Sequence, residues 1–142
     1  MNGNTRVSLW VTALGLLCLT AFGAQAAVIV VGPLACEYVL HPGVTVEGTL
    51  ELRNPDQRPQ EVKFYQTDYR FFADGSTEYG EPGSLPRSNA RWITFQPKQA
   101  TIPPGESLVL RYAIRVPEDS GLAGTYWSLL MVEPIPLGSQ ES

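Results

Sequence analysis

The stretch VTVEGTLELRN, residues 44–54, alternates apolar and polar side chains along its length. A period of two is typical of a strand, because successive side chains leave an extended backbone on opposite faces. One face carries Val44, Val46, Leu50 and Leu52, and the other carries Thr45, Glu47, Thr49 and Glu51. The stretch therefore predicts a half-buried strand of an antiparallel sheet.

Strand-like segments continue on both sides of this stretch. SLVLRYAIRVP, residues 107–117, alternates in the same way, and QEVKFYQTDYRFF, residues 60–72, ends at an Asp74–Gly75 hairpin signal. Shorter strands are expected in TEY, residues 77–79, and in RWITF, residues 91–95. VIVVGPLACEYVL, residues 28–40, predicts two strand pieces with a kink at Gly32–Pro33, because proline removes a ladder donor.

Strands at this spacing, with turn signals between them and no amphipathic helix after residue 26, predict an all-β sandwich. The expected core gathers apolar residues from several of these strands. It consists of Val46, Leu50, Leu52, Phe64, Leu110, Tyr112, Ile114 and Trp127.

The first 26 residues have the three parts of a secretory signal peptide. MNGNTR carries Arg6, an apolar run fills residues 7–22, and GAQA supplies small residues before a cut after Ala26. The alternative is an uncleaved anchor, since AAVIVV prolongs the apolar run. A lipoprotein reading through Cys18 is weaker, because Leu17 stands where a small residue is needed.

We therefore expect a signal peptide over residues 1–26, a domain over residues 27–136 and a polar tail over residues 137–142. The protein is expected to be exported and to reside in the periplasm or at the cell surface. After cleavage one cysteine, Cys36, remains among apolar neighbours, which favours a buried thiol over an intermolecular disulfide. The net charge of −4 argues against nucleic acid and anionic membrane surfaces as partners.

Three longer stretches carry a resemblance to a known family. They are LHPGVTVEGTLELRNPDQRPQEVKFY (40–65), WITFQPKQATIPPGESLVLRYAIRVP (92–117) and GTYWSLLMVEPIP (124–136). Together they resemble the immunoglobulin-like N-terminal domain of bacterial periplasmic pilus-assembly chaperones, and the layout is similar to that of WxL-interacting cell-wall proteins. The resemblance implies an immunoglobulin-like antiparallel β-sandwich of six to seven strands.

Two departures from that family matter. Its chaperones grip a carboxylate with an early arginine and a lysine of the seventh strand, whereas this chain has no arginine between Ala27 and Arg53. The resemblance makes residues 126–132 the sixth strand, and only the polar LGSQES follows EPIP. The domain is therefore expected to lack its own last (G) strand.

The edge of that sixth strand then needs a partner, because unpaired N–H and C=O groups at a sheet edge tend to pair with another chain. Three alternatives would provide this partner. Residues 28–31 could pair with the edge, a second protein could donate a strand, or the sequence could be a piece whose continuation carries the missing strand. Within the strand, the side chains of Trp127, Leu129 and Met131 are expected inside. The predicted partner-binding edge consists of Tyr126, Trp127, Ser128, Leu129, Leu130, Met131 and Val132.

The function expected from these features is non-catalytic binding of another envelope or secreted protein through a sheet edge, in envelope assembly or adhesion. A homodimer is a further possibility, and a membrane enters only through an uncleaved signal segment. The one histidine, His41, lies in an HPG turn, and no spacing indicates a metal or cofactor site. The alternative function is binding of cell-wall polysaccharide by stacking on Tyr65, Tyr69 and Trp92.

Overall fold

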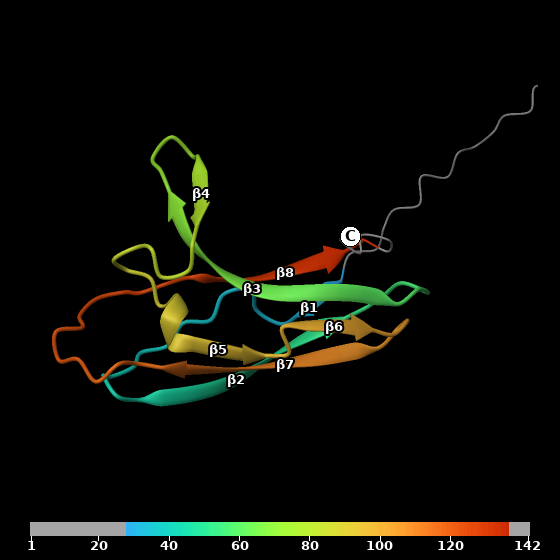
Figure 1. The fold of residues 1–142 in the computed structure, drawn as a ribbon, viewed down its shortest axis with the longest axis horizontal. Coiled ribbons are helices and arrows are strands. Elements are labelled where there is room, and N and C mark those ends of the chain that lie inside the picture. Colours follow the sequence, from blue (N-terminus) through green and yellow to red (C-terminus); the bar gives the residue numbers. More distant parts are fainter. Residues whose placement is uncertain (1–27, 137–142) are drawn as a thin grey trace, which may run out of the picture.

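The computed structural model describes residues 28–136, which form two antiparallel sheets that face each other (Figure 1). The first sheet has the order β1 (Ile29–Val31), β2 (Thr45–Arg53), β7 (Ser107–Arg115), β5 (Ile93–Gln96). In the second sheet, β3 (Gln60–Phe71) pairs with β4 (Thr77–Gly80), β6 (Gln99–Ile102) and β8 (Leu129–Ile135). The predicted immunoglobulin-like β-sandwich is confirmed, with eight strands in place of six to seven. The expected signal peptide and polar tail lie outside the described residues.

The core lies between the sheets and follows the alternation of the strands. Its buried cluster consists of Leu52, Val62, Phe64, Phe95, Ile102 and Leu110. Of the expected core residues, Leu52, Phe64, Leu110 and Ile114 are buried, and Val46, Leu50 and Tyr112 are half-buried. The expectation that Trp127 is buried is wrong, since its side chain is 44% exposed.

One side of the sandwich is closed by a chain that changes sheets. After the short 3-10 helix η1 (Ala90–Trp92), β5 pairs with β7, and β6 then pairs with β3. Strand β6 is not among the strands expected from the sequence. The strand contributes one large buried side chain, Ile102, so its local pattern is weak.

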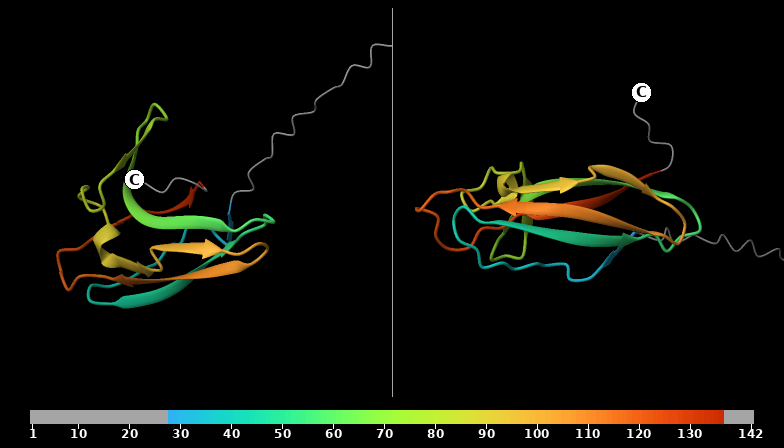
Figure 2. Two further views of the ribbon diagram at one scale, coloured as in Figure 1. Left: turned by 45° about the vertical axis from the view of Figure 1, so that its right-hand side comes forward. Right: turned by 90° about the horizontal axis from the view of Figure 1, so that it is seen from below.

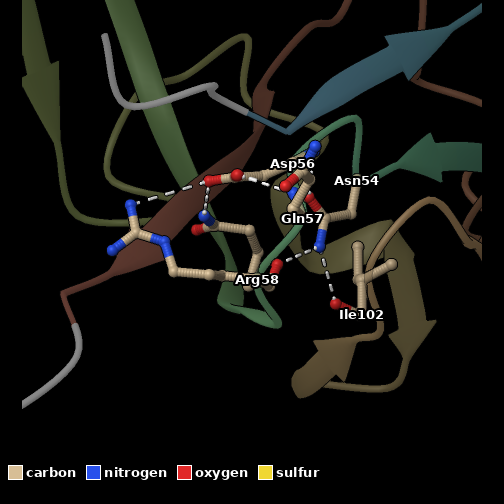
Figure 3. Close-up of polar contacts among 6 residues, drawn as sticks. Asn54, Asp56, Gln57, Arg58 and Ile102 are labelled. Atoms are coloured by element: carbon tan, nitrogen blue, oxygen red, sulfur yellow. Dashed lines mark hydrogen bonds and ion pairs between the residues drawn. The ribbon is translucent and has the colours of Figure 1, made fainter. Parts of the chain in front are cut away.

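The turn after β2 is fixed by the buried side chain of Asn54 (Figure 3). Its amide nitrogen donates to the carbonyl oxygens of Arg58 at 2.8 Å and Ile102 at 2.9 Å, and its oxygen accepts from the Asp56 N–H at 2.9 Å. The Asn54 N–H donates to the Glu106 carbonyl at 2.9 Å. These bonds join the 54–59 turn to the 103–106 turn, which satisfies polar groups at this end of the core.

The other side of the sandwich is less complete. β1 pairs with β2, with Val30 opposite Leu52, and does not pair with β8, so the expected pairing of residues 28–31 with the last strand is wrong. At Gly32 the backbone has a φ of +119°, which turns the chain out of the sheet. The second expected strand piece does not form, and residues 33–40 run beside β2 without a partner strand (Figure 2).

Cys36 belongs to this unpaired segment, and the expectation of a buried thiol is wrong because the side chain is exposed. Its neighbours Leu34 and Val39 are 88% and 97% exposed. An apolar sequence around a cysteine indicates burial only where a sheet or helix covers it, and no second layer covers residues 33–40 in the described structure.

Candidate functional site

The last strand, β8, pairs with β3 along one edge, from Leu129 opposite Thr67 to Ile135 opposite Glu61. Its other edge faces the side of the sandwich where residues 33–40 run (Figure 2). Within residues 28–136, no strand pairs with this outer edge. Within the described range, β8 is therefore an edge strand of its sheet.

Backbone geometry shows which groups of β8 lie on the outer edge. In an antiparallel sheet the N–H and C=O of one residue point to the same side of its strand, and successive residues alternate sides. Phe64 donates its N–H to the Lys98 carbonyl at 2.8 Å, so its backbone groups point toward β6. On the opposite side of β3, Phe64 lies beside Val132. That pair is not hydrogen-bonded, and Val132 directs its own N–H and C=O away from β3.

The same alternation applies along the strand. Leu130 and Val132 each present an N–H and a C=O on the outer edge, and Pro134 presents a carbonyl alone. Proline tolerates this position because no ladder bond there depends on its missing N–H. Leu129, Met131 and Glu133 direct their backbone groups to β3. The outer edge is thus a short row of donors and acceptors of the kind that pairs with an added strand.

The side chains of β8 face opposite ways from those expected. Leu130 and Val132 pack against the core cluster, which places Leu129 and Met131 on the outer face of the sheet. All four remain only half-buried. The expectation that Trp127, Leu129 and Met131 point inward is therefore wrong. Trp127 precedes the strand, and its indole N–H donates to the Tyr69 carbonyl at 3.0 Å.

The start of β8 is held by the loop before η1. Trp127 donates its N–H to the Arg87 carbonyl at 2.9 Å and accepts the Asn89 N–H at 3.3 Å. The Ser128 hydroxyl donates to the Asn89 side-chain oxygen at 2.6 Å. The loop replaces β3 as the hydrogen-bonding partner here, because β3 turns away to form the hairpin with β4, which projects from the sandwich (Figure 1). Residues 126–128 are therefore fixed by a loop, and β8 pairs as a strand only from Leu129.

This loop is anchored by the fully buried side chain of Asp68 in β3. Its carboxylate accepts the N–H groups of Gly83 at 3.0 Å and Leu85 at 2.8 Å, and also the hydroxyls of Ser84 and Ser88. Burial raises the pKa of the carboxyl, but the hydrogen bonds together outweigh it and the pKa is lowered. This anchor was not predicted, although an acid inside a strand of large side chains, followed by a loop that contains Ser84 and Ser88, is a usable signal.

The three aromatics expected to stack on sugars have separate surroundings. The Tyr65 hydroxyl donates to Glu133 at 2.8 Å, which raises the pKa of Tyr65. The Tyr69 ring lies 5.8 Å from that of Tyr79, and the Trp92 ring lies 4.7 Å from that of Tyr126. Among the described residues, no ring contact joins the three to one another.

Within residues 28–136, no three histidine, cysteine or acidic side chains come together in a way that would hold a metal ion. No helix in that range is long and apolar enough to cross a membrane. A hollow of about 930 Å³ lies where β2, β5 and β7 meet η1, and its lining combines charged residues such as Glu47 and Arg115 with apolar ones such as Trp92. His41 does not line it.

The likeness of this chain to known proteins is one of structure. No protein-family model and no curated protein matches the sequence. Among solved structures, the chain is similar to the ASH / PapD-like domain of human CEP192 (PapD-like domain 7), with 12% identity and a TM-score of 0.45. The match covers 82% of this chain and 74% of that domain's chain.

Proposed function

We propose that this chain is a protein-binding module that takes up an extended segment of a partner along the outer edge of β8. The observation that supports the proposal is the open row formed by the N–H and C=O groups of Leu130 and Val132 and the carbonyl of Pro134. A strand added there satisfies these groups in the manner of β-augmentation, in which main-chain bonds give affinity. The half-buried side chains of Leu130 and Val132 gain cover at the same time.

The setting that we propose is the exported one indicated by residues 1–26, with another envelope or secreted protein as the partner. An assembly or adhesion accessory needs no catalytic group of its own. It needs an edge that is rigid enough to present its backbone in register. The Asp68 anchor and the loop bonds to Trp127 and Ser128 serve that purpose, because they fix the chain just before the edge begins.

Substitution of Val132 by proline tests this proposal. Val132→Pro removes an N–H that points to the outer edge, and Pro134 shows that the strand accommodates proline in this orientation. We expect partner binding to weaken by roughly three- to tenfold for the lost hydrogen bond, and by more if the ring obstructs the added strand. The partner is first captured from an extract of the protein's own cells with the immobilised chain, then purified and titrated against both proteins.

The matched control is Val132→Thr, which keeps the N–H and nearly the same side-chain volume. Thermal unfolding of both variants shows whether the domain remains folded. Unchanged affinity of Val132→Pro, with unfolding like that of the control, would contradict binding through this edge.

A further inference from the structure

We infer that residues 33–40 form the second edge of the same binding site, so that the partner's strand lies between this segment and β8 and hydrogen-bonds to both. The inference rests on the proposed function and extends it, because it assigns a role to a part of the chain that has none in the sandwich.

The first observation is the state of the backbone in this segment. Residues 33–40 belong to no strand, and within the described chain their backbone N–H and C=O groups make no hydrogen bond. Residues 33–39 are exposed, so these backbone groups are accessible to an added strand. The bonds resume in the following turn, where the His41 carbonyl accepts the Val44 N–H at 3.2 Å and the Gly43 N–H donates to the Val116 carbonyl at 3.0 Å.

The second observation is the position of the segment. It runs along the side of the sandwich toward which the outer edge of β8 faces, at a level between the two sheets and in the direction opposite to β8 (Figures 1 and 2). Two unpaired extended edges thus lie on one side of one core. A strand placed there is antiparallel to β8 and parallel to residues 33–40.

A specific contact holds the segment in that place. The hydroxyls of Tyr38 and Tyr112 are hydrogen-bonded at 2.7 Å, and this bond, together with burial of the ring, raises the pKa of Tyr112. Tyr112 reaches the segment from β7 by crossing the backbone of Gly48, where a Cβ atom would lie only 2.3 Å from the ring. The glycine therefore makes room for the tyrosine that tethers the segment beside the open side.

The chemistry of the site identifies the occupant as an extended polypeptide. A β-strand presents alternating N–H and C=O groups on both of its edges, which two facing rows require. Its inward side chains must be apolar, because the partly buried residues packed against the core include Leu50, Tyr112, Leu130 and Val132. We therefore expect a partner segment with apolar residues at alternate positions and no proline on the paired stretch.

Amide exchange of the full chain with a model strand tests the inference. The probe is a capped peptide of seven residues, the length of β8, in which valine alternates with threonine, with a lysine added at each end. A scrambled peptide with consecutive valines is the control. The peptide is expected to slow exchange at Leu130 and Val132 and also at alternate amides between Leu34 and Val39.

The outcomes separate the two proposals. Slowing at β8 alone overturns the two-edged site and leaves the proposed function standing. No slowing at either edge at millimolar peptide contradicts both. Protection of the 34–39 amides before the peptide is added overturns the inference, because another part of the chain or a second copy then occupies that edge.

A pair of neighbouring proline substitutions gives an independent readout. Leu34→Pro and Ala35→Pro each remove an N–H that has no partner in the free domain, so the melting temperature should stay unchanged. Because successive N–H groups of a strand point to opposite sides, only one of the two variants should weaken peptide binding, by about three- to tenfold. Equal affinities for both variants and the wild type would contradict strand pairing by this segment.

Discussion

Replacement of Leu110 by alanine is expected to lower the free energy of unfolding by about 2–5 kcal/mol. Leu110 is fully buried, lies opposite Leu50 in the β2–β7 pairing, and belongs to the core cluster with Leu52, Val62 and Phe64. The truncation removes apolar contacts and leaves a cavity that strands held on both edges cannot close. Since a domain of this size is stable by only about 5–15 kcal/mol, the loss is a large part of the total.

The neighbouring residue provides the control. Val109 points to the opposite face of β7 and is half-exposed, so Val109→Ala should change the free energy of unfolding by about 0.5 kcal/mol or less. Urea unfolding of the two variants beside the wild type measures both effects. A Leu110→Ala variant with an unchanged midpoint would place Leu110 outside the core and contradict the assignment of the inner faces.

Replacement of Asp68 by alanine is expected to cost about 2–4 kcal/mol, because the change leaves the donors of Gly83, Ser84, Leu85 and Ser88 without their acceptor in a largely buried site. The loop that these bonds hold also binds Trp127, so the start of β8 should loosen. Thermal unfolding measures the loss of stability, and the fluorescence of the native state reports on the loop.

The pH dependence separates the charge of Asp68 from its shape, with Asp68→Asn as the control. The carboxyl has a lowered pKa in the folded state, so its contribution to stability is complete above the ordinary carboxyl pKa of about 4 and is lost as the pH falls through the lowered value. The wild type should therefore exceed Asp68→Asn in stability at pH 7, and the difference should shrink as the pH falls below about 4. A difference that does not change with pH would contradict the role of the charge.

The parts of the fold that the sequence predicts are those set by local alternation. Residues 44–54 and 107–117 form β2 and β7, in which Leu52, Leu110 and Ile114 are buried on the expected inner faces. The Asp74–Gly75 turn between β3 and β4 was also predictable, because Gly75 has a φ of +85°, a conformation that glycine adopts readily. Each of these features depends on a few neighbouring residues.

The errors concern contacts between segments far apart in the chain. Alternation cannot say which face of residues 126–132 is inside, because both faces are apolar, and Trp127 was placed by its size alone. The pairing of β1 with β2 in place of β8 joins Val30 to Leu52, and no local pattern reports which strand is the partner. The anchor at Asp68 joins residues up to 20 positions apart, and no local period reports such a bond.

The candidate site was predictable in outline and differs in detail. The expected open edge spans residues 126–132, but residues 126–128 are bound to the loop that contains Arg87 and Asn89. The free backbone groups begin at Leu130 and extend to Pro134, which the prediction did not include. The second unpaired segment, residues 33–40, was expected to be a strand, so its lack of partners was not foreseen.

Residue-resolved amide exchange of the full chain, as a monomer and without any partner, tests the central claim most directly. If the outer edge of β8 is open, the amides of Met131 and Glu133 are protected by β3, whereas those of Leu130 and Val132 exchange rapidly. Strong protection of Leu130 and Val132 in the monomer would show that the edge is already paired, and it would contradict strand addition as the function of this domain.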